Sequence, residues 1–167
     1  MTIRSLTIAA LFLAATATTA RAETPDADLV ARGAYLGRIM DCAGCHMPRD
    51  ADGHPDFEAG LSGGTVGFEL PGLGTFWPSN LTPHSTGLGN WSDAEIRTAI
   101  TTGVRPDGRI LAPVMPWPGY AGLEEPDLTA LVAWLRSMPP VENVVPAPVA
   151  PGAQATAPFF RVTLPAN

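Results

Sequence analysis

Both cysteines of the 167-residue chain stand three positions apart, in the sequence Cys42-Ala43-Gly44-Cys45-His46. Two thiols at this spacing can add across the two vinyl groups on one edge of a porphyrin, and the histidine that follows can then place its imidazole beneath the ring. C-x-x-C-H is accordingly the attachment pattern of c-type haem. The sequence therefore predicts one covalently bound haem c, with Cys42 and Cys45 as thioethers and His46 as an iron ligand.

Other uses of paired cysteines fit the sequence less well. A redox C-x-x-C motif is expected in a thioredoxin-like strand-and-helix setting, which the sequence around it does not predict. A zinc site needs about four ligands, and the remaining histidines, His54 and His84, stand in polar stretches without ligand spacing. A structural disulfide would leave the position of the histidine unexplained.

Methionines supply the best candidates for the second iron ligand. Two of them stand within six residues of His46, too close to reach the opposite face of the ring, and Met138 ends a predicted helix, where packing is the expected role. Met115 stands 69 residues after His46, in a loop that Pro113 and Pro116 stiffen. We predict Met115 as the second axial ligand; the alternative is a methionine that only fills a gap in the core.

An iron held by His46 and Met115 has both axial positions filled, so neither substrate nor oxygen finds a free coordination site. Such an iron gains and loses single electrons, and His/Met ligation raises its reduction potential relative to other haem ligands. The pattern therefore favours an electron carrier over an enzyme. An enzyme or gas sensor with a displaceable ligand is the alternative, and it predicts that the reduced protein binds carbon monoxide.

Other side chains are expected to border the haem. The Nδ1 proton of His46 is expected to bind a backbone carbonyl, which fixes the orientation of the ring, and the stretch 77–80 is the candidate source. The haem propionates need hydrogen-bond donors from nearby loops. The candidates are Arg105, Arg109, Trp77 and Trp117, with a solvated surface charge as the alternative role of each arginine.

Amphipathic patterns predict three helices, over residues 28–40, 92–102 and 126–138. The second opens with the capping-box sequence Ser-Asp-Ala-Glu. Trp134 of the third helix is expected to pack on the face of the first that carries two glycines four residues apart. The stretch 48–90 has no sustained period and predicts a long loop system with at most a short extended piece.

The first 22 residues have the pattern of an export signal. A short positive start precedes an apolar run over 6–17, and Ala20-Arg21-Ala22 offers a small-x-small cleavage site. The apolar run is shorter than the about 20 residues that a membrane span needs. We predict a signal peptide over 1–22, cleaved after Ala22, and a periplasmic protein without a membrane span after cleavage; a membrane anchor is the alternative.

The remaining chain divides into two regions. Residues 23–138 are predicted to form the haem domain, in which long loops and few helices leave a weak core that the haem would complete. Residues 139–167 form a proline-rich tail. The adjacent phenylalanines 159 and 160 favour a tail that docks on the domain, and a free linker is the alternative.

Charge composition limits the partners. The chain has 16 acidic residues against 10 basic ones, all of them arginine, and a net charge of −6, which becomes −8 without the first 22 residues. The absence of a basic run argues against nucleic-acid binding. Because the chain has no lysine, it is expected to dock through apolar contacts, a few arginines or a basic partner.

Four stretches resemble a known family. They are Asn-Leu-Thr-Pro at 80–83, Thr-Gly-Leu-Gly-Asn-Trp-Ser-Asp at 86–93, Gly-Val-Arg-Pro-Asp-Gly at 103–108 and Met-Pro at 115–116. With the order of helix, haem motif and methionine loop, they resemble class I cytochromes c. Over residues 30–138 the resemblance is closer still to the haem domains of the cytochrome c subunits of bacterial alcohol and aldehyde dehydrogenases.

The resemblance implies an all-α cytochrome c fold, with three to four short helices and long loops wrapped around one covalent haem, and axial ligation by His46 and Met115. It also implies a periplasmic dehydrogenase as electron donor and a respiratory cytochrome or oxidase as acceptor. The alternative is an electron-transfer subunit held permanently in a multi-subunit periplasmic dehydrogenase. Purification as an isolated monomer would favour the carrier, and a stable complex would favour the subunit.

Overall fold

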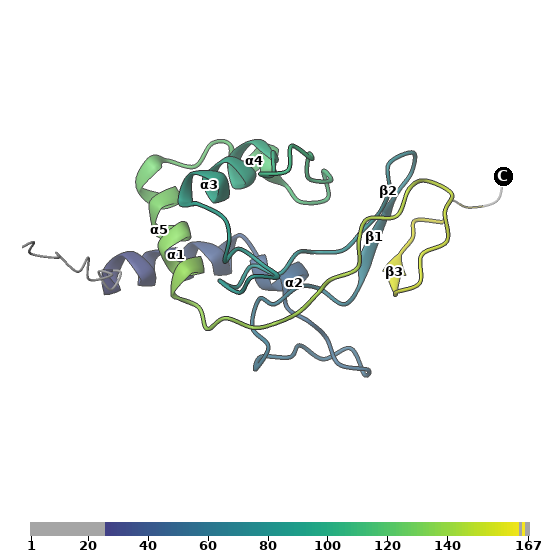
Figure 1. Ribbon diagram of the computed structural model, residues 1–167, viewed down its shortest axis with the longest axis horizontal. Coiled ribbons are helices and arrows are strands. Elements are labelled where there is room, and N and C mark those ends of the chain that lie inside the picture. The colour runs from purple at the N-terminus through teal and green to yellow at the C-terminus, as the bar shows by residue number, and fades with distance from the viewer. Residues whose placement is uncertain (1–25, 164, 166–167) are drawn as a thin grey trace, which may run out of the picture.

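Five helices and three short strands make up the part of the chain that the computed structural model describes, residues 26–163 and 165. In chain order they are α1 (Ala27–Ile39), α2 (Cys42–His46), β1 (Gly67–Leu70), β2 (Gly74–Phe76), α3 (Asp93–Thr102), α4 (Trp117–Tyr120), α5 (Glu125–Ser137) and β3 (Phe159–Phe160). The strands gather at one end of the molecule, α1, α3 and α5 lie toward the other, and α2 lies between them (Figure 1). The predicted signal peptide, residues 1–22, lies outside the described residues.

Small residues let α1 and α5 cross at close range. A Cβ atom added to Gly33 would overlap the backbone oxygen of Ala130, and one added to Gly37 would overlap the indole ring of Trp134. Only glycine therefore fits at either position, and the close packing that it allows compensates for its low helix propensity. The predicted packing of Trp134 on this face of the first helix is confirmed.

The capping box predicted for the second helix is present at the start of α3. Ser92 Oγ accepts from the backbone N–H of Glu95 at 3.3 Å, and the Glu95 carboxylate accepts from the backbone N–H of Ser92 at 2.6 Å. The helix ends at Gly103, whose φ of 73° is left-handed. Its apolar face packs on α5 in a core that consists of Leu88, Ile96, Val132 and Leu135.

The expectation of an all-α fold with three to four short helices is confirmed only in part, because the described residues form five helices and the three strands form a sheet in the order β2-β1-β3. β1 pairs antiparallel with β2 and parallel with β3. The strands are four, three and two residues long, too short for an alternating pattern to show in the sequence. β3, the parallel partner of β1, also stands about 90 residues further along the chain, so no local sequence pattern could predict this pairing.

The tail that supplies β3 runs from the end of α5 along the domain to the sheet (Figure 1). Val149 exchanges two backbone hydrogen bonds with Thr75, at 2.8 and 2.9 Å. The Phe160 ring lies 5.7 Å from that of Phe68 in β1. None of the helices in the described part of the chain has the length and apolarity that crossing a bilayer requires.

Candidate functional site

The cysteine-histidine motif forms a short helix of its own, α2. After α1 the chain passes Asp41, which has a left-handed backbone with φ of 55°, and α2 begins at the next residue. Aspartate tolerates this conformation better than most side chains do. Both thiols are free, with Cys42 half-buried and Cys45 exposed. Because residues three apart on a helix share a face, the two sulfurs are presented on one side of α2.

His46 is oriented by a backbone carbonyl. Its Nδ1 lies 2.7 Å from the oxygen of Ser79, and the expectation of a carbonyl from residues 77–80 is thereby confirmed. Since a carbonyl only accepts, Nδ1 carries the proton and Nε2 carries the lone pair. Burial lowers the pKa of His46, with the hydrogen bond to Ser79 opposing it. The ring is thus neutral at pH 7, the form that binds a metal ion.

The two thiols lack the acidity of a redox pair. Burial raises the pKa of Cys42 to about 11 and also raises the pKa of Cys45 above its ordinary value, and the charge of Asp41 adds to both shifts. Reactive C-x-x-C centres depend on a lowered thiol pKa. Protonated thiols at neutral pH argue against a dithiol redox centre, whereas thioether formation adds both sulfur and hydrogen across a vinyl bond.

Met115 is held in a loop that folds back on itself. Val104 and Ile110 form an antiparallel bridge at the base of the hairpin 104–110. Further along, the backbone N–H of Met115 donates to Ala112 at 3.0 Å, and its carbonyl accepts from Trp117 at 2.8 Å. The Met115 side chain is half-buried. Backbone hydrogen bonds therefore stiffen this loop in addition to its prolines.

Tyr120 of α4 links the methionine loop to the motif. Its hydroxyl donates to the backbone oxygen of Met40 at 3.1 Å. Burial raises the pKa of Tyr120, and the nearby groups of Cys42 and Cys45 raise it further. This hydrogen bond therefore holds the C-terminal end of the methionine loop close to the residues that precede α2. Sequence reasoning missed this residue, because a single tyrosine among prolines and glycines carries no periodic signal.

Arg105 and Arg109 stand opposite each other in the hairpin 104–110, which we call the arginine hairpin. The N–H of Arg105 donates to the carbonyl of Arg109 at 3.0 Å. Asp107 accepts from Arg105 Nε at 3.3 Å and from the backbone of Arg109 at 3.0 Å. Partial burial, and then the charge of Arg105, lower the pKa of Arg109. A further anion beside this pair, such as a propionate, would be stabilised by both guanidinium groups.

The tryptophans considered as propionate donors use their N–H groups within the protein. Nε1 of Trp77 donates to Pro158 at 2.9 Å, and Nε1 of Trp117 donates to Leu111 at 3.3 Å. An indole has a single donor. Within the described residues the Arg109 guanidinium makes no hydrogen bond, whereas Arg105 Nε donates to Asp107, so Arg109 is the candidate with free donors.

The residues around the motif fit a haem. Every buried side-chain nitrogen or oxygen in the described residues has a partner, and His46 Nε2 makes no hydrogen bond with residues 26–163. Val104, Ile110 and Val114 of the methionine loop are 37, 62 and 37% exposed. An apolar ring would cover such side chains, and the donor set of two thiols, imidazole and thioether is that of haem c.

Comparison with known proteins agrees with this chemistry. Residues 30–139 match the family model described as Cytochrome c. The chain belongs to the cytochrome c family. The cytochrome c domain here consists of helices with a small added sheet, and its family implies covalently attached haem c.

Similar proteins are described as cytochrome subunits of dehydrogenases. The chain is 38% identical over 133 residues to the cytochrome c subunit of alcohol dehydrogenase (quinone) from Gluconacetobacter polyoxogenes, covering 77% of this chain and 26% of the relative. It is 37% identical over 107 residues to the gluconate 2-dehydrogenase cytochrome c subunit of Pantoea cypripedii, covering 64% and 22%. It is 34% identical over 110 residues to the fructose dehydrogenase cytochrome subunit of Gluconobacter japonicus, covering 65% and 21%. The chain thus spans about a quarter of the length of these relatives.

Proposed function

We propose that this chain is an exported c-type cytochrome with one haem, which carries single electrons from a periplasmic dehydrogenase toward the respiratory chain. The observation that carries the proposal is the hydrogen bond between His46 Nδ1 and the carbonyl of Ser79. It orients a neutral imidazole on the same short helix, α2, that carries two free thiols. An imidazole whose other nitrogen is fixed by a carbonyl is prepared as a metal ligand.

Four side chains would hold the group. Cys42 and Cys45 would form the thioethers, while His46 and Met115 would bind the iron. When bound, the haem supplies one-electron oxidation and reduction at its iron. The protein would orient His46 and Met115, and with both bound the iron would have no coordination site for substrate. The arginine hairpin would neutralise the propionates.

A dehydrogenase as electron donor is supported by the relatives, which are described as cytochrome subunits of alcohol, gluconate and fructose dehydrogenases. A respiratory cytochrome or oxidase is the acceptor that we propose. Because the relatives are described as subunits, permanent residence in a multi-subunit dehydrogenase is the second candidate. The export pattern of residues 1–22 supports a periplasmic location.

The test begins with the full chain produced in a bacterial host that attaches haem c in its periplasm. We expect the exported protein to gain the mass of one haem and to retain it after denaturation. The oxidised protein is expected to show the weak near-infrared absorption of sulfur bound to iron(III). A product without covalent haem would contradict the proposal.

The donor is tested by reduction assays. Purified quinone-, flavin- and molybdenum-type dehydrogenases with their substrates are mixed with the oxidised protein, and reduction is followed at the haem absorption bands. We expect at least one of these dehydrogenases to reduce the protein. Size-exclusion chromatography of the protein purified from its native host then distinguishes the two candidate functions. A monomer supports the carrier, and co-elution with a catalytic subunit supports the permanent subunit.

A further inference from the structure

The carbonyl that orients His46 lies in a buried segment without regular structure. Residues 77–82 around Ser79 form neither helix nor strand, yet Trp77, Asn80 and Thr82 are only 7, 1 and 1% exposed. An irregular segment in the interior depends on specific hydrogen bonds for its position. The partners of these bonds therefore determine where the Ser79 oxygen lies.

Asn80 connects this segment to the tail. Its Oδ1 accepts from the backbone N–H of Thr82 at 2.9 Å and from the Thr82 hydroxyl at 2.8 Å. Its Nδ2 donates to the carbonyl of Val141 at 2.9 Å, and the N–H of Val141 donates back to Thr82 Oγ1 at 3.1 Å. Tail residue 141 is thus bonded to both buried polar side chains that follow Ser79.

Trp77 makes a second connection from the other side of Ser79. Its Nε1 donates to the carbonyl of Pro158 at 2.9 Å, and the same carbonyl accepts from the N–H of Gly67 in β1 at 2.9 Å. Side chains both before and after Ser79 therefore donate to carbonyls of the tail. The two carbonyls belong to tail residues 17 positions apart, so the segment is held at two separate places.

The tail also contacts a residue that is hydrogen-bonded to the backbone of the haem motif. The N–H of Gly63 donates to the backbone oxygen of His46 at 2.8 Å. Gly63 has a left-handed φ of 116°, and a Cβ atom there would overlap a methyl group of Val145. The tail therefore packs directly over a residue that bonds to the backbone of His46.

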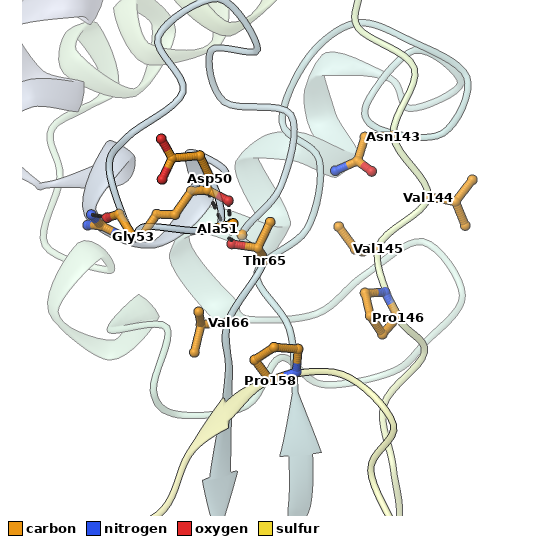
Figure 2. Close-up of a pocket in the computed structure, with 12 residues that line it drawn as sticks. Asp50, Ala51, Gly53, Thr65, Val66, Asn143, Val144, Val145, Pro146 and Pro158 are labelled. Carbon is orange, nitrogen blue, oxygen red and sulfur yellow. Dashed lines mark hydrogen bonds between the residues drawn. The ribbon is translucent and has the colours of Figure 1, made fainter.

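The tail touches the domain at discrete points. Figure 2 shows Asn143, Val145 and Pro158 around a cavity of about 570 Å³, with Thr65 and Val66 on its opposite side. Asn143 Nδ2 donates to the carbonyl of Ser62 at 2.9 Å. Beside this cavity, hydrogen bonds from Asn80, Trp77 and Asn143 join the tail to the domain.

We propose that residues 141–158, which we call the strap, fix the Ser79 carbonyl against the His46 ring and thereby tune the reduction potential of the haem. Trp77, Asn80 and Thr82 are positioning residues that transmit this effect. The proposal rests on the proposed function, since it concerns the iron ligand. It adds that a segment beyond the last helix controls the electronic state of that ligand.

The direction of the effect follows from ligand chemistry. A strong hydrogen bond from Nδ1–H to a carbonyl makes the imidazole a better electron donor through Nε2. A better donor stabilises iron(III) relative to iron(II) and lowers the reduction potential. Loosening the strap would lengthen the bond between His46 and Ser79 and raise the potential.

Two uncharged variants of the full holoprotein test the strap. Trp77→Phe removes the donor to Pro158 and keeps an aromatic ring, and Thr82→Val removes the hydroxyl bonded to Val141 at nearly constant volume. In the double variant we expect the equilibrium between iron(III) and iron(II) to shift about threefold toward iron(II), or about 30 mV for one electron. We also expect faster hydrogen exchange of the His46 Nδ1 proton, followed by NMR.

Thr129→Val is the matched control. Thr129 Oγ1 accepts from Arg97 at 2.8 Å and donates to the carbonyl of Glu125 at 2.8 Å, away from the strap. This variant should lower the thermal unfolding temperature without moving the potential. If the double variant does the same, with an unchanged potential and unchanged Nδ1 proton exchange, the strap proposal is wrong.

The two proposals fail in different ways. A wild-type chain that takes up no covalent haem overturns the proposed function, and the strap proposal with it. A wild-type chain with haem and sulfur ligation, alongside single and double variants of unchanged potential, overturns the strap proposal alone. If either single variant does not fold, the other measures the same effect through its own strap contact.

Discussion

The imidazole of His46 and the backbone carbonyl of Ser79 meet at 2.7 Å across a separation of 33 residues. The bond joins the haem motif on α2 to a loop segment that is itself bonded to the tail. Since the bond leaves Nε2 as the unprotonated nitrogen, one contact determines both the direction and the basicity of the expected iron ligand. Several properties of the holoprotein follow from the groups around this bond.

Replacement of Met115 by alanine is expected to lower the reduction potential and to open an axial position. The thioether favours iron(II), and its loss lets water or carbon monoxide reach the iron. The near-infrared absorption of the oxidised protein should disappear, and the reduced protein should bind carbon monoxide. Met138→Leu is the control, because Met138 packs against the core of α3 and α5; a band that survives in Met115→Ala would show that another residue is the ligand.

Replacement of either motif cysteine by alanine is expected to remove one thioether bond, and replacement of both is expected to abolish covalent attachment. Cys42 and Cys45 are the two cysteines of the chain, so no other thiol can compensate. Mass spectrometry after denaturation measures the attached haem. Ala43→Ser, an exposed change between the two cysteines, should retain one haem per chain, and haem bound covalently to the double variant would refute the assignment.

A methyl group added at the crossing of α1 and α5 should destabilise the fold. Gly33→Ala would place its Cβ against the backbone oxygen of Ala130, and overpacking of this kind costs about 1–3 kcal/mol. Urea unfolding of the holoprotein measures the loss. Gly119→Ala in α4 is the matched control, because a Cβ there meets no neighbouring atom; equal losses in the two variants would exclude close packing as the cause.

Acid should weaken the fold through the capping box of α3. The pKa of Glu95 lies below its ordinary value of 4.5, chiefly because its carboxylate accepts the backbone N–H of Ser92. A lowered folded-state pKa stabilises the fold above the unfolded-state value, and that stabilisation is lost as the pH falls through the folded-state value. We therefore expect the free energy of unfolding to decrease below about pH 4.5.

Glu95→Gln provides the comparison for this acid effect. Glutamine keeps the shape of the capping box and does not titrate, so the variant should lose less stability than the wild type between neutral and acid pH. Urea titrations at several pH values measure both proteins. Parallel pH curves would mean that Glu95 does not contribute to the acid sensitivity.

Features whose parts each leave a local or periodic pattern could be predicted from the sequence. The capping box of Ser92 and Glu95, the helices, and the packing of Trp134 on the glycines of α1 each follow from a periodic or local pattern. The carbonyl that accepts from the His46 imidazole could also be predicted to belong to residues 77–80, which include Ser79.

Features that depend on distant pairing could not be predicted. β3 gains its partner only when the tail reaches β1, and its two residues carry no period of their own. Tyr120 reaches Met40 across 80 residues through one hydroxyl. The sequence offers the indole N–H of Trp77 as a propionate donor, whereas in the fold that group donates to the carbonyl of Pro158.

The arginine hairpin affects how the proposed Met115 ligation should respond to high pH. Arg105 and Arg109 stand in the same loop as Met115, and the 167 residues include no lysine. A lysine amine that loses its proton at high pH can displace a thioether from iron, whereas a guanidinium stays protonated. In the proposed ligation the sulfur of Met115 therefore meets no competing side-chain amine as the pH rises.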